Sequence, residues 1–173
     1  DKRDIDTAMD SWITHEFDTK WEQQDWKLSL SRAGHIPGAG MLSIDTPSKN
    51  ILFTGDFDSR NSPLTSGAKP IKTDILFIEG TYGGKDHANL NEELTRFIDN
   101  IIRVTDKGGT VLIPAFANGR TQDMLMRLHQ NCPELDVHVD GMGKRITKLY
   151  LENTQFIRDP KALNAAWYWC RRV

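Results

Sequence analysis

The sequence predicts an α/β fold built in two parts, and the distribution of apolar residues along the chain supports this. Residues 1–83 carry short apolar stretches separated by turn-forming residues, which is typical of a β-rich part. Residues 84–173 alternate strand-like apolar runs with segments of helical periodicity, which favours parallel crossover units. The composition, with 38% hydrophobic and 27% charged residues, is that of an ordinary globular protein.

The first part is expected to contain a short helix followed by strands. Residues 4–12 have the caps and acids of a short helix, and residues 26–33 alternate apolar and polar side chains like a half-buried strand. Residues 41–45 and 51–54 predict a hairpin, because turn-forming residues join them. Residues 75–78 form a continuous apolar run, which is typical of a strand covered on both faces.

The second part is expected to alternate helices with strands. Apolar side chains recur at helical spacing over residues 90–102, and residues 111–113 predict a second buried strand. A helix over residues 121–130, a short strand over residues 137–139 and a third helix over residues 144–153 follow. This order of elements is the basis of the predicted crossover units.

The overall charge and the cysteine content exclude several classes of protein. The net charge of −2 and the pI near 6.2 give no global positive field, so attraction for a polyanion must come from a local cleft. Cys132 and Cys170 form neither a zinc knuckle nor a disulfide framework, which fits a reducing cytosol. Because there is no signal peptide and no run long enough to cross a membrane, we expect a soluble cytoplasmic protein.

Three polar side chains follow predicted strands and are candidates for chemistry. His35 lies in the segment GHIPGA, Asp56 follows the strand over residues 51–54, and Glu79 follows the strand over residues 75–78. Each has an ordinary structural interpretation when taken alone, such as a histidine or aspartate bonded within a turn. Together they indicate a site, because strands hold such groups rigidly at one edge of a sheet while loops leave them open to substrate.

The segment PAFANGRTQ at residues 114–122 turns from a predicted strand into a predicted helix. Backbone N–H groups at the start of that helix, at Gly119, Arg120 and Thr121, together with the positive end of the helix dipole, favour a bound phosphate. Arg120 adds a bidentate donor at the same place. An exposed arginine beside a capped helix explains the pattern equally well.

Together, these segments resemble the metallo-β-lactamase superfamily, and specifically its β-CASP branch. That branch includes the cleavage and polyadenylation specificity nucleases, their archaeal relatives and bacterial ribonuclease J. The segment GHIPGA is similar to the superfamily's third metal motif, and GDF at residues 55–57 to its fourth. IEGTYGGKDH at residues 78–87 resembles the first β-CASP motif, and residues 108–125 resemble the strand-turn-helix that follows it. The order and spacing match from about residue 4 to residue 150.

The resemblance implies a fold and a set of residue roles. Residues 1–83 would be the C-terminal part of a metallo-β-lactamase αββα sandwich, and residues 84–173 the first part of a Rossmann-like β-CASP domain. His35 would ligate one zinc ion, Asp56 would bridge two zinc ions, and Glu79 would orient a histidine that acts as general acid. The RNA-phosphate contacts would come from Gly119, Arg120 and Thr121.

Part of the family pattern is missing from the sequence. The run His-x-His-x-Asp-His does not occur, and the later β-CASP histidines have no counterpart. The chain starts without Met and ends at aromatic residues with no closing signal, so we interpret it as an internal fragment. His35 and Asp56 supply at most two ligands, whereas a catalytic zinc usually has three from the protein. We therefore expect the 173 residues alone to bind zinc poorly and not to cleave RNA.

The resemblance implies zinc-dependent hydrolysis of RNA phosphodiester bonds, by endo- or 5′-exonucleolytic cleavage, with single-stranded DNA as the other candidate polymer. RNA would lie between the two parts, and a homodimer or an RNA-processing complex is the expected assembly.

Three alternatives stay open: a non-catalytic homologue acting as an RNA-processing scaffold, a small-molecule hydrolase of the wider superfamily, and an α/β module in which Arg120 binds a nucleotide phosphate. The presence of His35, Asp56 and Glu79 disfavours the first, and residues 84–150 disfavour the second.

Overall fold

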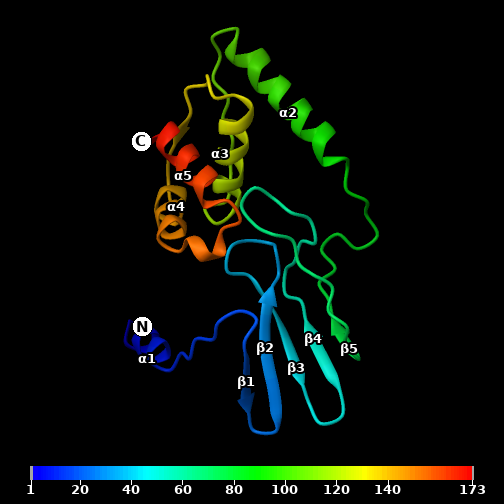
Figure 1. Ribbon diagram of the computed structural model, residues 1–173. Coiled ribbons are helices and arrows are strands. Elements are labelled where there is room, and N and C mark those ends of the chain that lie inside the picture. The colour runs from blue at the N-terminus through cyan, green and yellow to red at the C-terminus, as the bar shows by residue number, and fades with distance from the viewer. Residues whose placement is uncertain (1, 173) are drawn as a thin grey trace.

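The computed structural model describes residues 2–172, in which a five-stranded sheet lies next to a group of helices (Figure 1). The α/β fold class predicted from the sequence is confirmed. The elements in chain order are α1 (Lys2–Asp10), β1 (Lys20–Gln23), β2 (Trp26–Arg32), β3 (Gly40–Asp45), β4 (Asn50–Phe53), β5 (Ile75–Phe77), α2 (Leu90–Thr105), α3 (Arg120–Asn131), β6 (His138–Val139), α4 (Gly143–Glu152), η1 (Thr154–Phe156), α5 (Pro160–Trp169) and β7 (Arg171–Arg172).

The large sheet has the order β1-β2-β3-β4-β5, with antiparallel pairs up to β4 and a parallel pair between β4 and β5. The predicted hairpin is confirmed, because β3 and β4 pair from Leu42 opposite Phe53 to Asp45 opposite Asn50. β2, β4 and β5 run in the same direction, so their carboxyl ends share one edge of the sheet. That edge faces the group of helices (Figure 1).

Two of the helices, α2 and α5, begin at residues whose side chains cap them. The side chain of Asn89 accepts hydrogen bonds from the backbone N–H groups of Asn91 and Glu92 at the start of α2. Asp159 caps α5 in the same way through the N–H of Ala162, and proline occupies the first position of that helix. The four helices predicted from the sequence are present as α1 to α4, whereas α5 was not predicted.

Two predictions about buried strands are wrong. β5 forms, but all three of its residues are exposed rather than covered on both faces. Residues 111–113 are not a strand, and Leu112 is 89% exposed. An apolar run becomes a buried strand only where strands and layers cover both of its faces. β5 pairs with β4 but stays exposed, and Val111 and Ile113 pack only partly against the cluster between α2 and α3. Among the described residues of the second part, 84–172, strand pairing is limited to the short parallel pair β6–β7.

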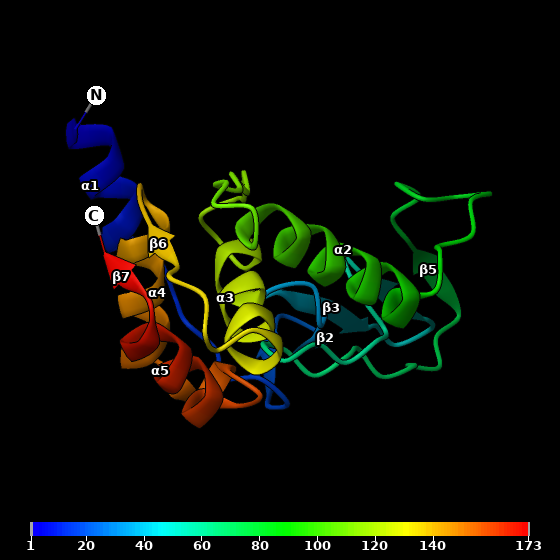
Figure 2. The same cartoon turned by 90° about the horizontal axis from the view of Figure 1, so that it is seen from above.

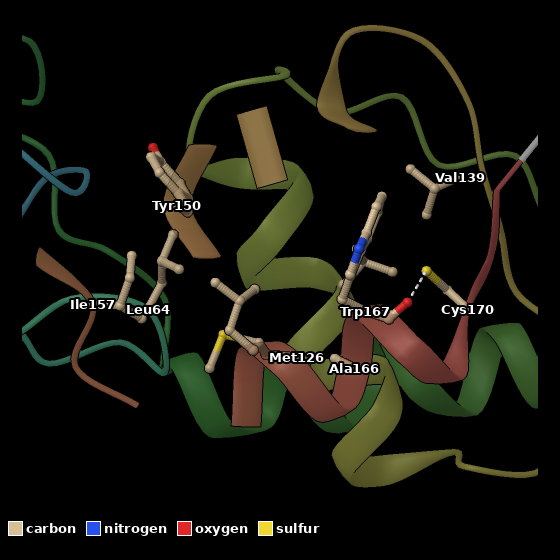
Figure 3. Close-up of a cluster of buried hydrophobic side chains, with 10 residues drawn as sticks. Leu64, Met126, Val139, Tyr150, Ile157, Ala166, Trp167 and Cys170 are labelled. Carbon is tan, nitrogen blue, oxygen red and sulfur yellow. Dashed lines mark hydrogen bonds between the residues drawn. The ribbon is translucent and has the colours of Figure 1, made fainter. Parts of the chain in front are cut away.

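The core consists of three clusters of buried side chains. Ala33, Met41 and Leu52 form the cluster of the sheet. A second cluster joins α2 to α3, and these two helices lie side by side in Figure 2. The third and largest, shown in Figure 3, joins α3, α4 and α5 and contains Leu64, which comes from the loop between β4 and β5. This loop therefore connects the sheet to the helices. No helix among residues 2–172 is long and apolar enough to span a membrane.

Candidate active site

Three polar residues predicted from the sequence follow strands that end at the same edge of the sheet. They are His35, three residues beyond β2, Asp56, three residues beyond β4, and Glu79, two residues beyond β5. Backbone hydrogen bonds connect these strand ends. The N–H of Thr54 donates to the carbonyl of Phe77 (3.0 Å), and the N–H of Asp58 donates to the carbonyl of Ala33 (2.9 Å). The loops that carry the three residues are therefore neighbours.

His35 lies on a tight loop that leaves its imidazole exposed. Ala33 donates its N–H to the carbonyl of Ala39 (2.9 Å), which closes the loop. Gly34 has a φ of +73°, and a Cβ at this position would lie 2.3 Å from the carbonyl oxygen of Asp58. Only glycine fits there, because both the left-handed backbone and the close approach exclude a side chain. The backbone next to the imidazole is therefore fixed against the loop that follows β4.

Thr54 connects Asp56 to Glu79. Its buried hydroxyl donates to the carbonyl of Gly55 (2.7 Å) and accepts from the backbone N–H of Glu79 (3.3 Å). The carboxylate of Asp56, two residues further on, is exposed. One side chain thus positions both acid-bearing segments, which come from two parallel strands.

The carboxylate of Glu79 is stabilised in its charged form. Its Oε2 accepts a hydrogen bond from the N–H of Thr81 (3.0 Å). Hydrogen bonds from Thr81 lower the pKa of Glu79 below its usual range, and a backbone hydrogen bond from Phe57 and the charge of His35 lower it further.

Imidazole nitrogen and carboxylate oxygen are both good ligands for zinc, and His35 and Asp56 provide one of each. The set is nevertheless too small. Within residues 2–172, no group of three or more His, Cys, Asp or Glu side chains is placed to hold a metal ion. His35 and Asp56 therefore do not make a complete zinc site with the other described residues.

A cleft of about 360 Å³ lies between this edge of the sheet and the start of α3. It is lined by residues of the loop after β2, the loop after β4 and the segment that leads into α3. His35 lines the cleft, whereas Asp56 and Glu79 are not among its lining residues. Its charged side chains besides the histidine are Arg60, Arg120, Arg127, Asp58 and Asp123. Arginines outnumber aspartates in this cleft, although the whole chain has a net charge of −2.

The structure differs from the sequence-based expectation in how the backbone donors at the start of α3 are used. The N–H groups of Gly119, Arg120 and Thr121 donate within the chain, to Gln122 Oε1 (2.9 Å), Asn118 O (3.1 Å) and Phe116 O (3.1 Å), respectively. The hydroxyl of Thr121 also donates to the carbonyl of Phe116 (2.8 Å). The side chain of Arg120 is 62% exposed and lines the cleft, so its guanidinium can donate to a ligand there.

Gly119 joins two of the predicted motifs. Its φ is +83°, and a Cβ there would lie 2.5 Å from Cγ2 of Ile36, the residue after the candidate ligand His35. The neighbouring Asn118 accepts a hydrogen bond from the hydroxyl of Tyr150. Burial raises the pKa of Tyr150 to about 12, so this phenol stays a neutral donor. The turn before α3 is thus held against both the His35 loop and α4.

The sequence did not identify three residues that line this cleft. Arg60 lies in a loop without any motif, Phe116 lies next to a predicted buried strand, and Asp123 looks like an ordinary acid in the first turn of a helix. Phe116 and Asp123 do lie in the segment over residues 108–125 that resembles the family, but no local pattern marks them as cleft residues, because the cleft forms between distant segments.

Comparison with known proteins identifies relatives along most of the chain. It is 31% identical to RNase aCSPSF2 of Saccharolobus solfataricus over 167 residues, which are 95% of this chain and 34% of that protein. It is 33% identical over 168 residues to a protein of Methanocaldococcus jannaschii named as an RNase, covering 94% of this chain and 39% of that protein. It is also 36% identical over 132 residues to cleavage and polyadenylation specificity factor subunit 3 of Dictyostelium discoideum, covering 75% of this chain and 17% of that protein.

No family model matches the sequence. The chain spans between a third and two fifths of the length of the first two relatives. The matched region nevertheless covers nearly all of the chain, and it includes the strand-end residues and the segment before α3. The chain therefore belongs to the β-CASP branch of the metallo-β-lactamase superfamily, a family of metal-dependent nucleases.

Proposed function

We propose that this protein hydrolyses RNA phosphodiester bonds in a metal-dependent reaction, as an endoribonuclease, a 5′-exoribonuclease or both. The observation that carries the proposal is the position of His35, Asp56 and Glu79 at one edge of the sheet, next to a cleft rich in arginine. RNA is preferred to single-stranded DNA as the substrate because the similar proteins are named as ribonucleases.

The proposed roles follow from the chemistry of each side chain. His35 and Asp56 are metal ligands, with zinc as the metal and two ions in a complete site. When bound, such ions supply an activated water and clamp the phosphodiester. Glu79 positions a histidine that acts as general acid, and the lowered pKa of its carboxyl supports this role because a charged carboxylate orients an imidazole well.

Binding of the RNA phosphates is assigned to Gly119, Arg120 and Thr121, with the guanidinium of Arg120 as the donor. Gly119 and Thr121 contribute by holding the backbone of this turn, since their own N–H groups already have partners. An arginine fork suits a phosphate because it offers two parallel hydrogen bonds together with a positive charge.

The proposal extends to the organisation of the protein. Residues 1–83 are the C-terminal part of the metallo-β-lactamase segment, residues 84–173 are the first part of the β-CASP domain, and RNA lies between them. The position of the cleft between the sheet and α3 supports this division. We place the protein in the cytoplasm, as a homodimer or as a member of an RNA-processing complex.

A second candidate function is an RNA-processing scaffold that binds RNA without cutting it. The observation that favours it is that the cleft offers groups that bind RNA without a metal, such as the exposed guanidinium of Arg120. A nuclease assay and a metal analysis of the complete protein distinguish the two candidates, because a scaffold of this kind neither holds metal at His35 and Asp56 nor cleaves RNA.

The nuclease proposal is tested by substituting the candidate ligands in the complete protein. H35A and D56N are each expected to lower the rate of RNA cleavage by at least roughly 100-fold, because a bound metal contributes several kcal/mol to the stability of the transition state. The matched control is H15A, because His15 is also exposed but stacks on Trp21 away from the cleft. Full cleavage activity in H35A and D56N would refute the proposal.

The 173 residues alone are expected to bind zinc weakly and to leave RNA intact, since His35 and Asp56 provide at most two ligands. Zinc titration by calorimetry, followed by incubation with a labelled RNA, measures both properties. Cleavage by this chain at the rate of a complete enzyme would contradict the expectation.

A further inference from the structure

Asp123 is a buried acid at the wall of the cleft, and one of its oxygens has no partner. The residue is 6% exposed, and its Oδ2 accepts a hydrogen bond from Nε of Arg127 at 2.8 Å. Its Oδ1 is buried and has no hydrogen-bond partner. No other buried side-chain nitrogen or oxygen within residues 2–172 lacks a partner in this way. A buried acceptor without a donor is costly and needs an explanation. A hydrogen-bond donor on a ligand in the cleft would satisfy this oxygen.

The side chain next to this carboxylate is loosely held. Nη1 of Arg120 lies 4.0 Å from Oδ2 of Asp123, at the limit of an ion pair, and the arginine side chain is 62% exposed. A contact at this distance, made by an arginine that is mostly exposed, contributes little to stability. Arg120 can therefore turn toward a phosphate in the cleft at small cost. The site proposed below requires this movement to uncover the buried Oδ1 of Asp123.

Phe116 adds an aromatic surface to the same cleft. It lines the cleft and is 83% exposed, which is unusual for a phenylalanine. Its carbonyl accepts hydrogen bonds from both the N–H and the hydroxyl of Thr121, so its backbone is fixed to the start of α3. An exposed ring on a fixed backbone is a suitable platform for a base, because single-stranded RNA is bound largely by stacking.

We propose that this cleft holds one ribonucleotide of a single-stranded RNA. The base stacks on Phe116, the phosphate pairs with Arg120, and the ribose 2′-hydroxyl donates a hydrogen bond to Oδ1 of Asp123. The volume of about 360 Å³ is within the range of sites for small ligands. The inference rests on the proposed function for its choice of RNA as ligand, and adds to it the basis on which RNA is distinguished from DNA.

The proposal is tested by binding of matched ribo- and deoxyribo-oligonucleotides to the chain, measured by fluorescence anisotropy with a chelator present so that nothing is cleaved. The wild-type chain is expected to bind the ribo-oligonucleotide roughly tenfold more tightly, which is the usual effect of one hydrogen bond to a charged group. D123N is expected to reduce this difference to about twofold or less. Its amide oxygen can still accept from Arg127, whereas its NH₂ group cannot accept at the position of Oδ1.

The aromatic platform is tested separately with F116A. This variant is expected to bind both polymers roughly tenfold more weakly without changing the preference between them, because stacking does not involve the 2′-hydroxyl. The matched controls are Y168A, an exposed aromatic residue of α5, and D99N, an exposed acid of α2. Neither residue lines the cleft, and both variants are expected to bind like the wild type.

One measurement does not depend on the folding of any variant. Single 2′-deoxy substitutions are placed in turn along the RNA, and one position is expected to lower the affinity of the wild-type chain roughly tenfold.

Equal affinity of the wild type for both polymers, no binding of either, or an unchanged RNA preference in D123N would overturn the ribonucleotide site. Cleavage of RNA by the complete protein alongside any of these results would leave the proposed function intact. An RNA preference that depends on Asp123, without cleavage by the complete protein, would support the site and overturn the nuclease proposal.

Discussion

Gly34 and Gly84 have the same φ of +73° but different surroundings. A Cβ at Gly34 would lie 2.3 Å from the carbonyl oxygen of Asp58, whereas a Cβ at Gly84 would have no heavy atom within 4 Å. Both positions disfavour a side chain because of their backbone conformation. At Gly34 the close contact with the loop after β4 adds to that cost. This contact places the candidate ligand His35 next to the segment that carries Asp56.

We therefore predict that G34A destabilises the protein more than G84A. The left-handed backbone costs roughly 1–2 kcal/mol in both variants. The clash with Asp58 should raise the total for G34A to roughly 3 kcal/mol or more, since the contact is with backbone and cannot be relieved by a side-chain movement. Urea denaturation of both variants measures the difference. Equal free energies of unfolding would show that the close approach has no energetic consequence.

At the scale of the element, α3 depends on a buried glutamine in its first turn. Gln122 is fully buried, and its Oε1 accepts from the N–H of Gly119 (2.9 Å). Its Nε2 lies within hydrogen-bond distance of the carbonyls of Ala117 (3.0 Å) and Gly143 (3.3 Å) and of the hydroxyl of Thr147 (2.9 Å). This side chain thus takes the place of a conventional cap and ties α3 to α4.

Replacing this glutamine by methionine keeps the volume but removes every hydrogen bond. Q122M is expected to lower the free energy of unfolding by roughly 2–4 kcal/mol, because several buried polar groups lose their partner at once. Q130M, an exposed position on the same helix, is the matched control and should change stability by less than roughly 0.5 kcal/mol. Thermal and urea denaturation measure both. If both variants were as stable as the wild type, the network around Gln122 would not be needed to hold the start of α3.

At the scale of the whole molecule, the loop between β4 and β5 holds the sheet against the helices. Leu64 is 2% exposed within the helical cluster of Figure 3, although it belongs to the chain segment that follows the sheet. Its carbonyl accepts from the N–H of Arg158 (2.9 Å), and the hydroxyl of Thr65 donates to the carbonyl of Gly34 (2.7 Å). One loop therefore contacts the helices on one side and the His35 loop on the other.

L64A is predicted to destabilise the protein by roughly 2–5 kcal/mol, the usual range when a buried leucine is truncated to alanine. L112A is the control, since Leu112 is 89% exposed and its truncation should be almost neutral. Because Leu64 connects the sheet to the helices, the unfolding transition should move to lower urea concentration when followed by tryptophan fluorescence and also by circular dichroism. A loss of stability no larger than that of L112A would mean that the two halves are held together elsewhere.

The sequence by itself determined the elements whose signals are local. Apolar periodicity predicts a helix such as α2, and turn residues predict the hairpin of β3 and β4, whereas α5 was not predicted. The order of the strand-end motifs also indicated the family, because each motif is contiguous in the chain. Such signals depend on residues a few positions apart, and physical interactions within one turn or one hairpin are sufficient to produce them.

Only the tertiary structure decided which of these elements are covered and which groups meet. The apolar run at residues 111–113 is not a strand here, since a strand needs neighbours that periodicity cannot supply. The N–H of Gly119 is used by Gln122 rather than left open for a phosphate. Phe116 and Asp123 line a cleft with loops that lie more than fifty residues earlier in the sequence. Contacts over such distances arise from packing of the whole chain, and no short pattern of residues records them.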